Sequence, residues 1–490
     1  MITKSKILLN LQCPKRLWLS LNRTNLVADA LNLKSKMEEG NKVGELARTF
    51  YPQGYLVSAK TNQLAIDDTK IKIEEEKNKT LFEAAFVYEE VLIRADILIP
   101  EHNGYRLEEV KSSTQIKPYH IEDAAVQNWV LQNNGYEPTS VHITYINNKF
   151  KYIDKNNYNG LFISGDITEA VYGLIKKVPI WVNKAKDTVS SNKEPIRAVG
   201  KHCKKPFECP YFNHCNTKDP DIKYPLDILP NSSVLIKKFV DEGYKCLTSI
   251  PEERLSNEKH KRIWRVSKSG EPELDIQASK ILNQLPYPWF FLDFETIAYA
   301  IPRWVGTRPY MQVPFQWSCH IKRTAKSSIE NEEHKEFLDI TGEDPREDFI
   351  INLIKAVENE GTIFVYNEAF EKTRIAELQR DFPQYAQELQ NINSRIFDLL
   401  KIARNHYYHP NMMGSWSIKN VLPTVYDGAT YGELEVKNGT MAQEEYRRAI
   451  SIDTTTEEKI KIDRALKKYC HTDTLSMWRV ADRFLELSSS

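Results

Sequence analysis

Two carboxylates and a lysine fall within two neighbouring stretches that are predicted to be strands. The stretch 91–99 is apolar and largely β-branched, yet it contains Asp96, whose burial is costly unless the carboxylate is paired or binds a metal. In the next stretch, 105–111, Glu109 and Lys111 share one face because side chains alternate along a strand. A hairpin would bring this face near Asp96. The set is typical of a Mg²⁺ or Mn²⁺ site that generates a hydroxide for phosphodiester hydrolysis, whereas a lone E-x-K pattern is more often a solvated hairpin face.

A second group of acids begins at the end of another apolar strand. Asp293 and Glu295 form a D-x-E pattern and project from one face of that strand. Glu371 follows a later strand, and Tyr469 and Asp473 lie four residues apart on one face of a predicted helix. Acids that end a buried strand are poorly explained as structure. They would suit a pair of metals about 4 Å apart that grip one phosphate.

Four of the seven cysteines have a spacing that indicates ligation. They are Cys13, Cys203, Cys209 and Cys215. The last three form a C-x5-C-x5-C pattern in a lysine-rich stretch, where buried free thiols are not expected. By spacing alone, these three could bind zinc together with His202 or His214, or all four thiolates could hold a [4Fe–4S] cluster.

The elements that must position these groups alternate between helices and strands, which predicts a mixed α/β protein. In the first part of the chain we expect helices near 5–22, 35–50, 119–134 and 167–188, and strands near 81–88, 91–99, 105–111 and 139–146. In the last part we expect strands near 289–294, 314–322 and 362–366, and helices near 346–359, 370–379 and 456–486. A change of composition near residue 217 predicts one domain at 1–218, a connector at 219–285 and a second domain at 286–490.

Composition bounds the class of protein. The chain has 490 residues, with 67 Lys and Arg against 67 Asp and Glu, so its formal net charge is zero. Apolar residues make up 41%, which is ordinary for a globular protein and too many for a disordered one. It contains no apolar run of the ~18 residues that a membrane span requires, and its N-terminus lacks the pattern of a secretory signal. We therefore expect a cytoplasmic protein without a membrane partner.

The neutral total hides an uneven distribution of charge. Residues 176–218 contain ten basic residues against three acidic ones, and three of the clustered cysteines lie in the same stretch. Such a local excess predicts salt-sensitive binding of phosphate groups, as in a track for nucleic acid. Part of the acidic count belongs to the expected metal sites, where a bound cation neutralises it.

The first acidic set resembles the core of the PD-(D/E)XK nuclease superfamily. The matching residues are Asp96 and Glu109-Val110-Lys111, and the sequence Asp123-Ala124-Ala125-Val126-Gln127 is similar to the glutamine-containing helix of its RecB-like branch. The resemblance implies that Gln127 lies near the active site. Glu45 and Glu83 are weaker candidates for further acidic ligands. This branch often has a histidine near the position of Glu45, and the sequence lacks it, so the resemblance does not fix the number of metal ligands.

The separation of one N-terminal cysteine from three later ones resembles the iron–sulfur nucleases of this branch. In these, a cluster joins the N-terminal helix to the C-terminal end of the nuclease domain. The resemblance implies that Cys13, Cys203, Cys209 and Cys215 hold a [4Fe–4S] cluster. Because the spacing within the trio differs from the usual pattern, Zn²⁺ is the alternative.

The second acidic set resembles the DEDDy exonucleases of the RNase H-like (DnaQ-like) fold. The resemblance implies that the metal ligands are Asp293, Glu295, Glu371 and Asp473, and that Tyr469 orients the attacking water. Glu371 departs from the family, which usually has aspartate there. Lys419 lies in a later segment that also resembles this fold, where it could contact a phosphate, although an ordinary surface lysine is the more common interpretation.

Together the two parts resemble an uncharacterised bacterial family in which an iron–sulfur, RecB-like, restriction-endonuclease-like domain precedes an RNase H-like α/β domain. This layout implies a metal-dependent nuclease with two active sites that acts on DNA, on single strands or duplex ends, in repair or antiviral defence. The alternatives are an RNA exonuclease, or a nucleic-acid-binding scaffold in which one site has decayed. The sequence contains no G-x-x-x-x-G-K-[ST] motif of a helicase.

Overall fold

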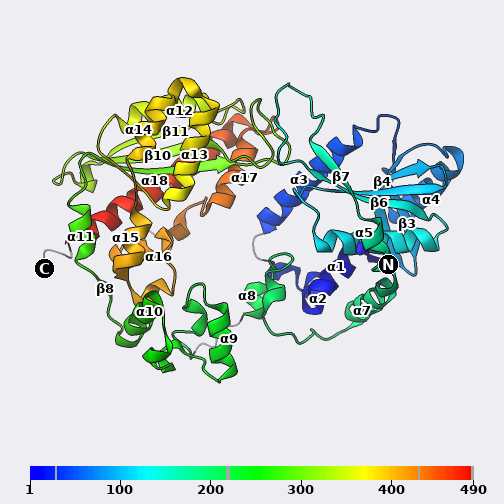
Figure 1. Cartoon of the computed structure of the whole chain (residues 1–490), viewed down its shortest axis with the longest axis horizontal. Coiled ribbons are helices and arrows are strands. Elements are labelled where there is room, and N and C mark those ends of the chain that lie inside the picture. Colours follow the sequence, from blue (N-terminus) through cyan, green and yellow to red (C-terminus); the bar gives the residue numbers. More distant parts are fainter. Residues whose placement is uncertain (28–29, 217–220, 429–430, 487–490) are drawn as a thin grey trace. The chain divides into compact units, whose positions relative to one another are not determined.

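The computed structural model describes residues 1–27, 30–216, 221–428 and 431–486. It confirms a mixed α/β protein with several sheets (Figure 1). The chain divides into two compact units. The first comprises Met1–Thr217 and Tyr299–Met311, and the second comprises Lys218–Ala298 and Gln312–Ser490. The predicted junction at residues 218 and 219 lies outside the described residues. No helix in the described ranges combines the length and apolar character that crossing a bilayer requires.

The first unit is built on a seven-stranded sheet in the order β2-β3-β4-β5-β6-β7, with β1 added beside β4. Its strands are β1 (Ile2–Thr3), β2 (Tyr55–Leu56), β3 (Leu81–Tyr88), β4 (Val91–Glu101), β5 (Gly104–Lys111), β6 (Pro138–Ile146) and β7 (Phe162–Asp166). Its α-helices are α1 (Lys4–Gln12), α2 (Pro14–Asn22), α3 (Ala30–Arg48), α4 (Asn62–Glu75), α5 (Pro118–Asn133), α6 (Thr168–Tyr172), α7 (Val178–Ser190) and α8 (Phe212–Cys215). Helix α5 packs its buried face on the sheet, and α1 and α7 complete the same core.

Two helices that the sequence pattern predicts as continuous are interrupted. The helix expected at 5–22 is divided into α1 and α2 by Cys13, whose backbone is extended. Pro14 disfavours a helical conformation at the preceding residue, and it then begins α2. The helix expected at 167–188 is divided into α6 and α7, and Pro179, which lacks an N–H, lies in the first turn of α7. The first interruption places Cys13 between two helices.

The second unit is built on a five-stranded sheet in the order β11-β10-β9-β12-β13, with a separate pair, β8 and β14. The strands are β8 (Glu273–Leu274), β9 (Trp289–Ile297), β10 (Val313–Lys322), β11 (Glu333–Leu338), β12 (Thr362–Val365), β13 (Ile396–Asp398) and β14 (Tyr407–Tyr408). The α-helices are α9 (Ser233–Asp241), α10 (Glu258–Ser269), α11 (Gln277–Leu282), α12 (Arg346–Val357), α13 (Glu368–Asp381), α14 (Ala386–Ser394), α15 (Leu399–His406), α16 (Ile418–Val425), α17 (Gly439–Ala449) and α18 (Thr456–Glu486). Within this unit, α12–α14 cover one face of the sheet and α18 covers the other (Figure 1).

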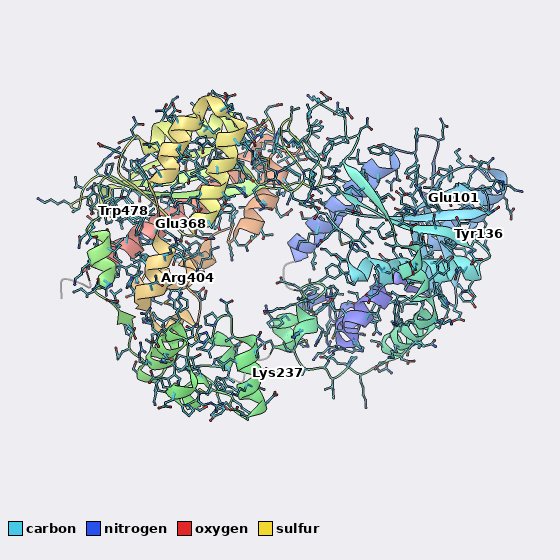
Figure 2. The ribbon with its side chains drawn as sticks, viewed as in Figure 1. Glu101, Tyr136, Lys237, Glu368, Arg404 and Trp478 are labelled. Carbon is cyan, nitrogen blue, oxygen red and sulfur yellow. The ribbon has the colours of Figure 1, made fainter. Side chains whose placement is uncertain are left out.

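The central strand β9 sends alternate side chains into two cores. Phe290, Leu292 and Phe294 pack among residues of α12, α13 and α14. Trp289 and Phe291 face the opposite core, where Phe291 stacks on Trp478 of α18. Figure 2 labels Trp478. Because the period is two, residues 293 and 295 continue the face that meets α18. The apolar alternation of β9 thus determines where its acids point.

Part of the segment expected to act as a connector belongs to the core of the second unit. Phe239 of α9 and Ile263 and Trp264 of α10 pack in the same buried cluster as Trp289. Residues 299–311 instead belong to the first unit, where Ala300 packs with Val43. The connector is highly charged, so its sequence does not indicate that a few of its apolar residues pack in the core of the second unit.

Replacement of Phe291 by alanine is expected to destabilise the second unit by about 3–5 kcal/mol, because the fully buried ring contacts both Phe364 and Trp478. Urea unfolding followed by hydrogen exchange of β9 peptides measures this loss. The matched truncation Ile452→Ala, at an almost fully exposed side chain, should cost less than about 0.5 kcal/mol. Similar losses for both variants would contradict the placement of β9 at the centre of the core.

Candidate functional site

Three acids line up across three adjacent strands of the first unit. In the β3–β4 ladder, Phe82 pairs with Ile97 and Ala84 with Ala95, so Glu83 lies opposite Asp96. The β4–β5 ladder ends at the pair Ile97 and Glu108, which places Asp96 beside Glu109. Beyond that pair, the Val110 N–H donates a 2.8 Å hydrogen bond to the Oδ2 atom of Asp96. The carboxylate thus takes the place of a backbone carbonyl as the acceptor. The expected hairpin geometry is therefore present.

Helix α5 supplies the polar groups that hold Glu109 and Lys111. Lys111 Nζ lies 2.7 Å from Glu109 Oε1 and 2.6 Å from Asp123 Oδ2. Gln127 Nε2 donates to Glu109 Oε2 at 2.7 Å. Lys4, at the start of α1, contacts Glu109 Oε1 at 2.7 Å and Asp123 Oδ1 at 3.2 Å. The charges of Lys4, Glu109, Lys111 and Asp123 are thus paired within one compact network.

Burial and mutual repulsion perturb the acids of this network. Burial, with the charge of Glu109, raises the pKa of Asp96 to about 7. Burial alone would lower the pKa of Lys111, but Asp123, Glu109 and Asp96 together raise it well above its usual range. The lysine therefore stays cationic, and Asp96 is the acid most in need of an added cation. Strong perturbation in a cleft is a feature of functional sites.

A cavity of about 400 Å³ opens beside these residues. Its walls include Asp96, Glu109 and Lys111, together with the two weaker sequence candidates, Glu45 of α3 and Glu83 of β3. The backbone of Glu83 has φ of 55°, which is a strained conformation within a strand. This cavity brings all the predicted acids of the first unit to one concave surface.

In the second unit, three acids converge from β9 and α18. One carboxylate oxygen from each of Asp293, Glu295 and Asp473 lies within 4.8 Å of the other two. Asp473 Oδ1 also accepts a 2.6 Å hydrogen bond from the Tyr431 hydroxyl. Asp473 follows Asp293 by 180 positions in the sequence. The two-residue period of β9 places Asp293 and Glu295 on one face of the strand, and α18 brings Asp473 to that face.

The like charges of this site raise its pKa values. Burial, together with Asp473, raises the pKa of Glu295 to about 8, and burial raises the pKa of Asp473 to about 6. Lys419 opposes both shifts. A set of buried carboxylates with raised pKa values is the arrangement that a divalent cation would relieve.

Glu371 of α13 lies near this set without joining its closest members. Its charge raises the pKa of Asp293, but it is not among the three acids whose oxygens lie within 4.8 Å. Its Oε2 atom is buried without a hydrogen-bond partner, and burial raises the pKa of Glu371 to about 8. A buried carboxylate oxygen without a hydrogen-bond partner is costly. The position of Glu371 therefore fits a side chain that binds a metal ion.

Tyr469 lies one turn before Asp473 on α18, and Lys419 lies beside it. Lys419 Nζ is 3.4 Å from the Tyr469 hydroxyl and 5.0–5.1 Å from the ring centres of Tyr431 and Tyr469. Burial, with the nearby acids Asp473 and Glu295, raises the pKa of Tyr469, so the phenol remains protonated and can donate a hydrogen bond. Lys419 is therefore part of the site and not a solvated surface lysine.

The four predicted cysteines line one small enclosed pocket of the first unit. Gln12, next to Cys13, donates hydrogen bonds to the carbonyls of His202 and Phe207, both at 2.7 Å. These bonds attach the N-terminal helices to the loop that carries the other three cysteines. Burial raises the pKa values of Cys209 and Cys215, and the nearby cations Arg16 and Lys15 oppose this rise without cancelling it.

Some residues of these sites were not identified from sequence. Lys4 carries no local pattern, and its role depends on how α1 packs more than 100 residues away from Glu109. Tyr431 stands outside the segments that carried the family resemblance. Cys470 is buried with its sulfur 3.7 Å from Asp293 Oδ2. Its position directly after Tyr469 in the Y-x-x-x-D pattern was the one available indication.

Comparisons with known proteins give one partial match. A family model described as a domain of unknown function (DUF2779) matches residues 290–417. The matched segment includes Asp293, Glu295 and Glu371, and it ends before Tyr469 and Asp473. No curated protein and no solved structure matches the chain.

The stability of metal-free protein should fall as pH rises. The folded chain retains a proton on Glu295 between its usual pKa near 4.5 and about 8, so the free energy of unfolding decreases through this window. Added Mn²⁺ should reverse the loss, most strongly near pH 8. Hydrogen-exchange protection factors of β9 and α18 peptides measure both effects.

Asp293→Asn removes one of the repelling acids. It should increase protection of metal-free protein near pH 8, by about tenfold or more, and abolish the response to Mn²⁺. Asp453→Asn, at an exposed aspartate, is the matched control and should leave both unchanged. Protection that rises with pH without metal would contradict the assignment of the acids to one repelling cluster.

Proposed function

We propose that the protein is a metal-dependent nuclease with two active sites, one in each unit. The observation that carries this proposal is the convergence of Asp293, Glu295 and Asp473, whose oxygens lie within 4.8 Å and whose burial raises the pKa of each. Oxygen donors in this number fit Mg²⁺ or Mn²⁺. The family resemblance supports an RNase H-like exonuclease site here and a RecB-like PD-(D/E)XK site in the first unit.

In the first unit, Asp96 and Glu109 would hold the metal, with Glu83 and Glu45 available from the cavity wall. When bound, the metal polarises the phosphodiester and lowers the pKa of an attacking water. Lys111 is kept cationic and close to Glu109, where it can orient that water and stabilise negative charge on the phosphate. Gln127 fixes the second oxygen of Glu109, and Lys4 holds Asp123 and Glu109 from the other side.

In the second unit, Asp293, Glu295 and Asp473 would be the closest ligands, with Glu371 as a more distant acid. Tyr469 remains protonated, so its hydroxyl can orient the attacking water by hydrogen bonding. Lys419 adds a cation beside that hydroxyl, where the phosphate of a nucleotide would carry its charge. Removal of nucleotides from 3′ ends is the activity that the DEDDy resemblance implies.

DNA is the substrate that we propose, and the first unit offers a path for its backbone. A groove of about 800 Å³ beside the cysteines is lined by Arg16, Lys36 and Lys204 and by Phe207, whose ring is 46% exposed. Cationic side chains with an exposed aromatic ring suit a single strand, since the cations contact phosphates and the ring stacks on a base. RNA would satisfy the same contacts and is the alternative.

The cysteine pocket is proposed to hold a [4Fe–4S] cluster. A single Zn²⁺ with Zn–S bonds of about 2.3 Å would draw its thiolates to within about 3.8 Å of one another. Among the described residues, no three of the cysteine sulfurs lie within 4.8 Å of one another. The sulfurs are therefore spread more widely than a single zinc ion requires. A cluster separates its thiolates further because each binds a different iron.

Nuclease activity can be separated between the two sites with labelled single-stranded DNA. Lys111→Ala should lower the rate of cleavage by the first site at least about 100-fold. The degradation that remains should begin at 3′ ends. Asp293→Asn should remove that second activity by a similar factor. Gel analysis of 5′-labelled DNA with free or blocked 3′ ends, in Mg²⁺ or Mn²⁺, measures both.

The double variant Lys111→Ala, Asp293→Asn should be inactive, whereas Lys151→Ala with Asp453→Asn should behave as wild type because both side chains are exposed. A double variant as fast as wild type would refute both sites. Degradation of RNA with no degradation of DNA would favour the RNA alternative.

Protein purified without oxygen should contain about four iron and four sulfide ions per chain. Cys203→Ser should lower the iron content sharply, and Cys246→Ser, a substitution at a partly exposed thiol in the other unit, should not. Elemental analysis and visible absorbance measure the result. Colourless protein with one zinc ion per chain would identify the alternative metal.

A further inference from the structure

Three histidines meet on the second unit outside the acidic site. His320 of β10 lies directly opposite His334 of β11 in the antiparallel ladder, and His471 projects from α18 onto the same place. The three ring centres are mutually 4.5 Å apart. One ring nitrogen from each lies within 4.8 Å of the other two. Three imidazoles gathered this closely from two strands and a helix form the usual donor set of a zinc site.

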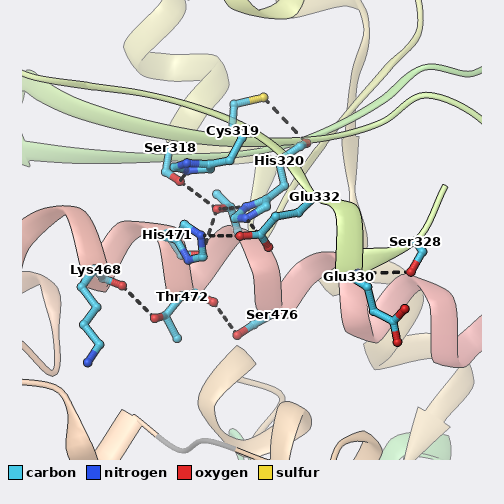
Figure 3. Close-up of polar contacts among 12 residues, drawn as sticks. Ser318, Cys319, His320, Ser328, Glu330, Glu332, Lys468, His471, Thr472 and Ser476 are labelled. Carbon is cyan, nitrogen blue, oxygen red and sulfur yellow. Dashed lines mark hydrogen bonds and ion pairs between the residues drawn. The ribbon is translucent and has the colours of Figure 1, made fainter.

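A carboxylate lies against two of the three rings. Glu332, just before β11, places Oε2 3.3 Å from His320 Nε2 and Oε1 3.1 Å from His471 Nε2. Figure 3 shows His320 and His471 turned toward this carboxylate between the strands and α18. Donor atoms in tetrahedral coordination with Zn–ligand bonds of about 2.0–2.1 Å lie about 3.3 Å apart. The two nitrogen–oxygen distances are therefore already those of a metal-bound set.

The buried ring of His320 is held in the form that binds metal. His320 is fully buried, and its Nε2 atom makes no hydrogen bond to any residue that the structure describes. Burial and the neighbouring His334 and His471 lower the pKa of His320 to about 2, so the ring is neutral. Its other nitrogen, Nδ1, lies 2.8 Å from Thr474 Oγ1, which also lies 3.1 Å from the His471 carbonyl oxygen.

A second ring is oriented in the same way. His334 Nε2 lies 2.8 Å from Ser318 Oγ, and burial lowers the pKa of His334 to about 4. Hydroxyl groups that fix the outer nitrogen of an imidazole orient the inner nitrogen toward a metal. The hydroxyls of Ser318 and Thr474 contact each other at 2.8 Å, so the two supports are joined.

We propose that His320, His334, His471 and Glu332 bind one Zn²⁺ ion in a closed, structural site. Imidazole and carboxylate donors suit zinc, and four protein ligands leave no open position for substrate. The ion would attach the β10–β11 hairpin to the middle of α18.

The location of the site gives it a consequence for the acids. His471 lies between Tyr469 and Asp473 on α18, and Ser318 of β10 pairs with Asp293 in the ladder. A metal that fixes α18 on the hairpin would therefore fix the distance from Asp473 to Asp293. This consequence rests on the proposed function, whereas the zinc site itself does not. Under it, the four ligands are positioning residues for the acidic site.

Cobalt is a suitable probe because tetrahedral Co²⁺ absorbs visible light strongly, octahedral Co²⁺ absorbs weakly, and thiolate ligands add a charge-transfer band. Metal-depleted full-length protein titrated with Co²⁺ should develop the strong band without a thiolate contribution for one equivalent. His334→Gln and His471→Gln, at half-buried positions, should each lose that equivalent. His102→Gln, at an exposed histidine, and Asp293→Asn should retain it.

Competition with Zn²⁺ should abolish the band in wild-type protein and shift its thermal unfolding upward, and both histidine variants should lack that shift. Circular dichroism establishes that the variants are folded. Absence of the band from wild type, or its persistence in both variants, would overturn the zinc site. Because Asp293→Asn should lose nuclease activity yet keep the band, failure of the nuclease proposal is distinguishable from failure of this one.

Discussion

In the second unit, the packing of β9 against α18 buries like-charged carboxylates against one another. Asp293 and Glu295 occupy the face of β9 that meets α18, and the same face carries Trp289 and Phe291 into the core. The aromatic packing that stabilises the sheet thus also forces the acids inward, where they raise each other's pKa. Such an arrangement costs stability without a cation and is retained where function requires it.

The first unit meets the same constraint with its own cations. Lys111 and Lys4 neutralise Glu109 and Asp123, whereas Asp96 keeps a raised pKa and faces the cavity. The first unit therefore pairs most of its acids with lysines, whereas the acids of the second unit keep raised pKa values despite the nearby Lys419. This difference explains why loss of metal should affect the stability of the second unit more than that of the first.

Local periodicity was enough to predict much of this arrangement. The strands that carry Asp96 and Asp293, and the helix that carries Asp473, follow from alternation and from four-residue spacing. The contributions of Lys4 and of the β10–β11 histidines could not be predicted, because they depend on packing between segments far apart in sequence. The break at Cys13 follows from Pro14, which disfavours a helical conformation at the preceding residue. The helical periodicity alone predicted one continuous helix there.

Diffraction from crystals grown with Mn²⁺, recorded at the manganese absorption edge, tests the central claim most directly. The account predicts anomalous peaks among the carboxylates of Asp293, Glu295 and Asp473, and beside Asp96 and Glu109. The pKa of Glu295 would then no longer hold it protonated near neutral pH. Well-ordered crystals in saturating Mn²⁺ without a peak at either acidic set would contradict it.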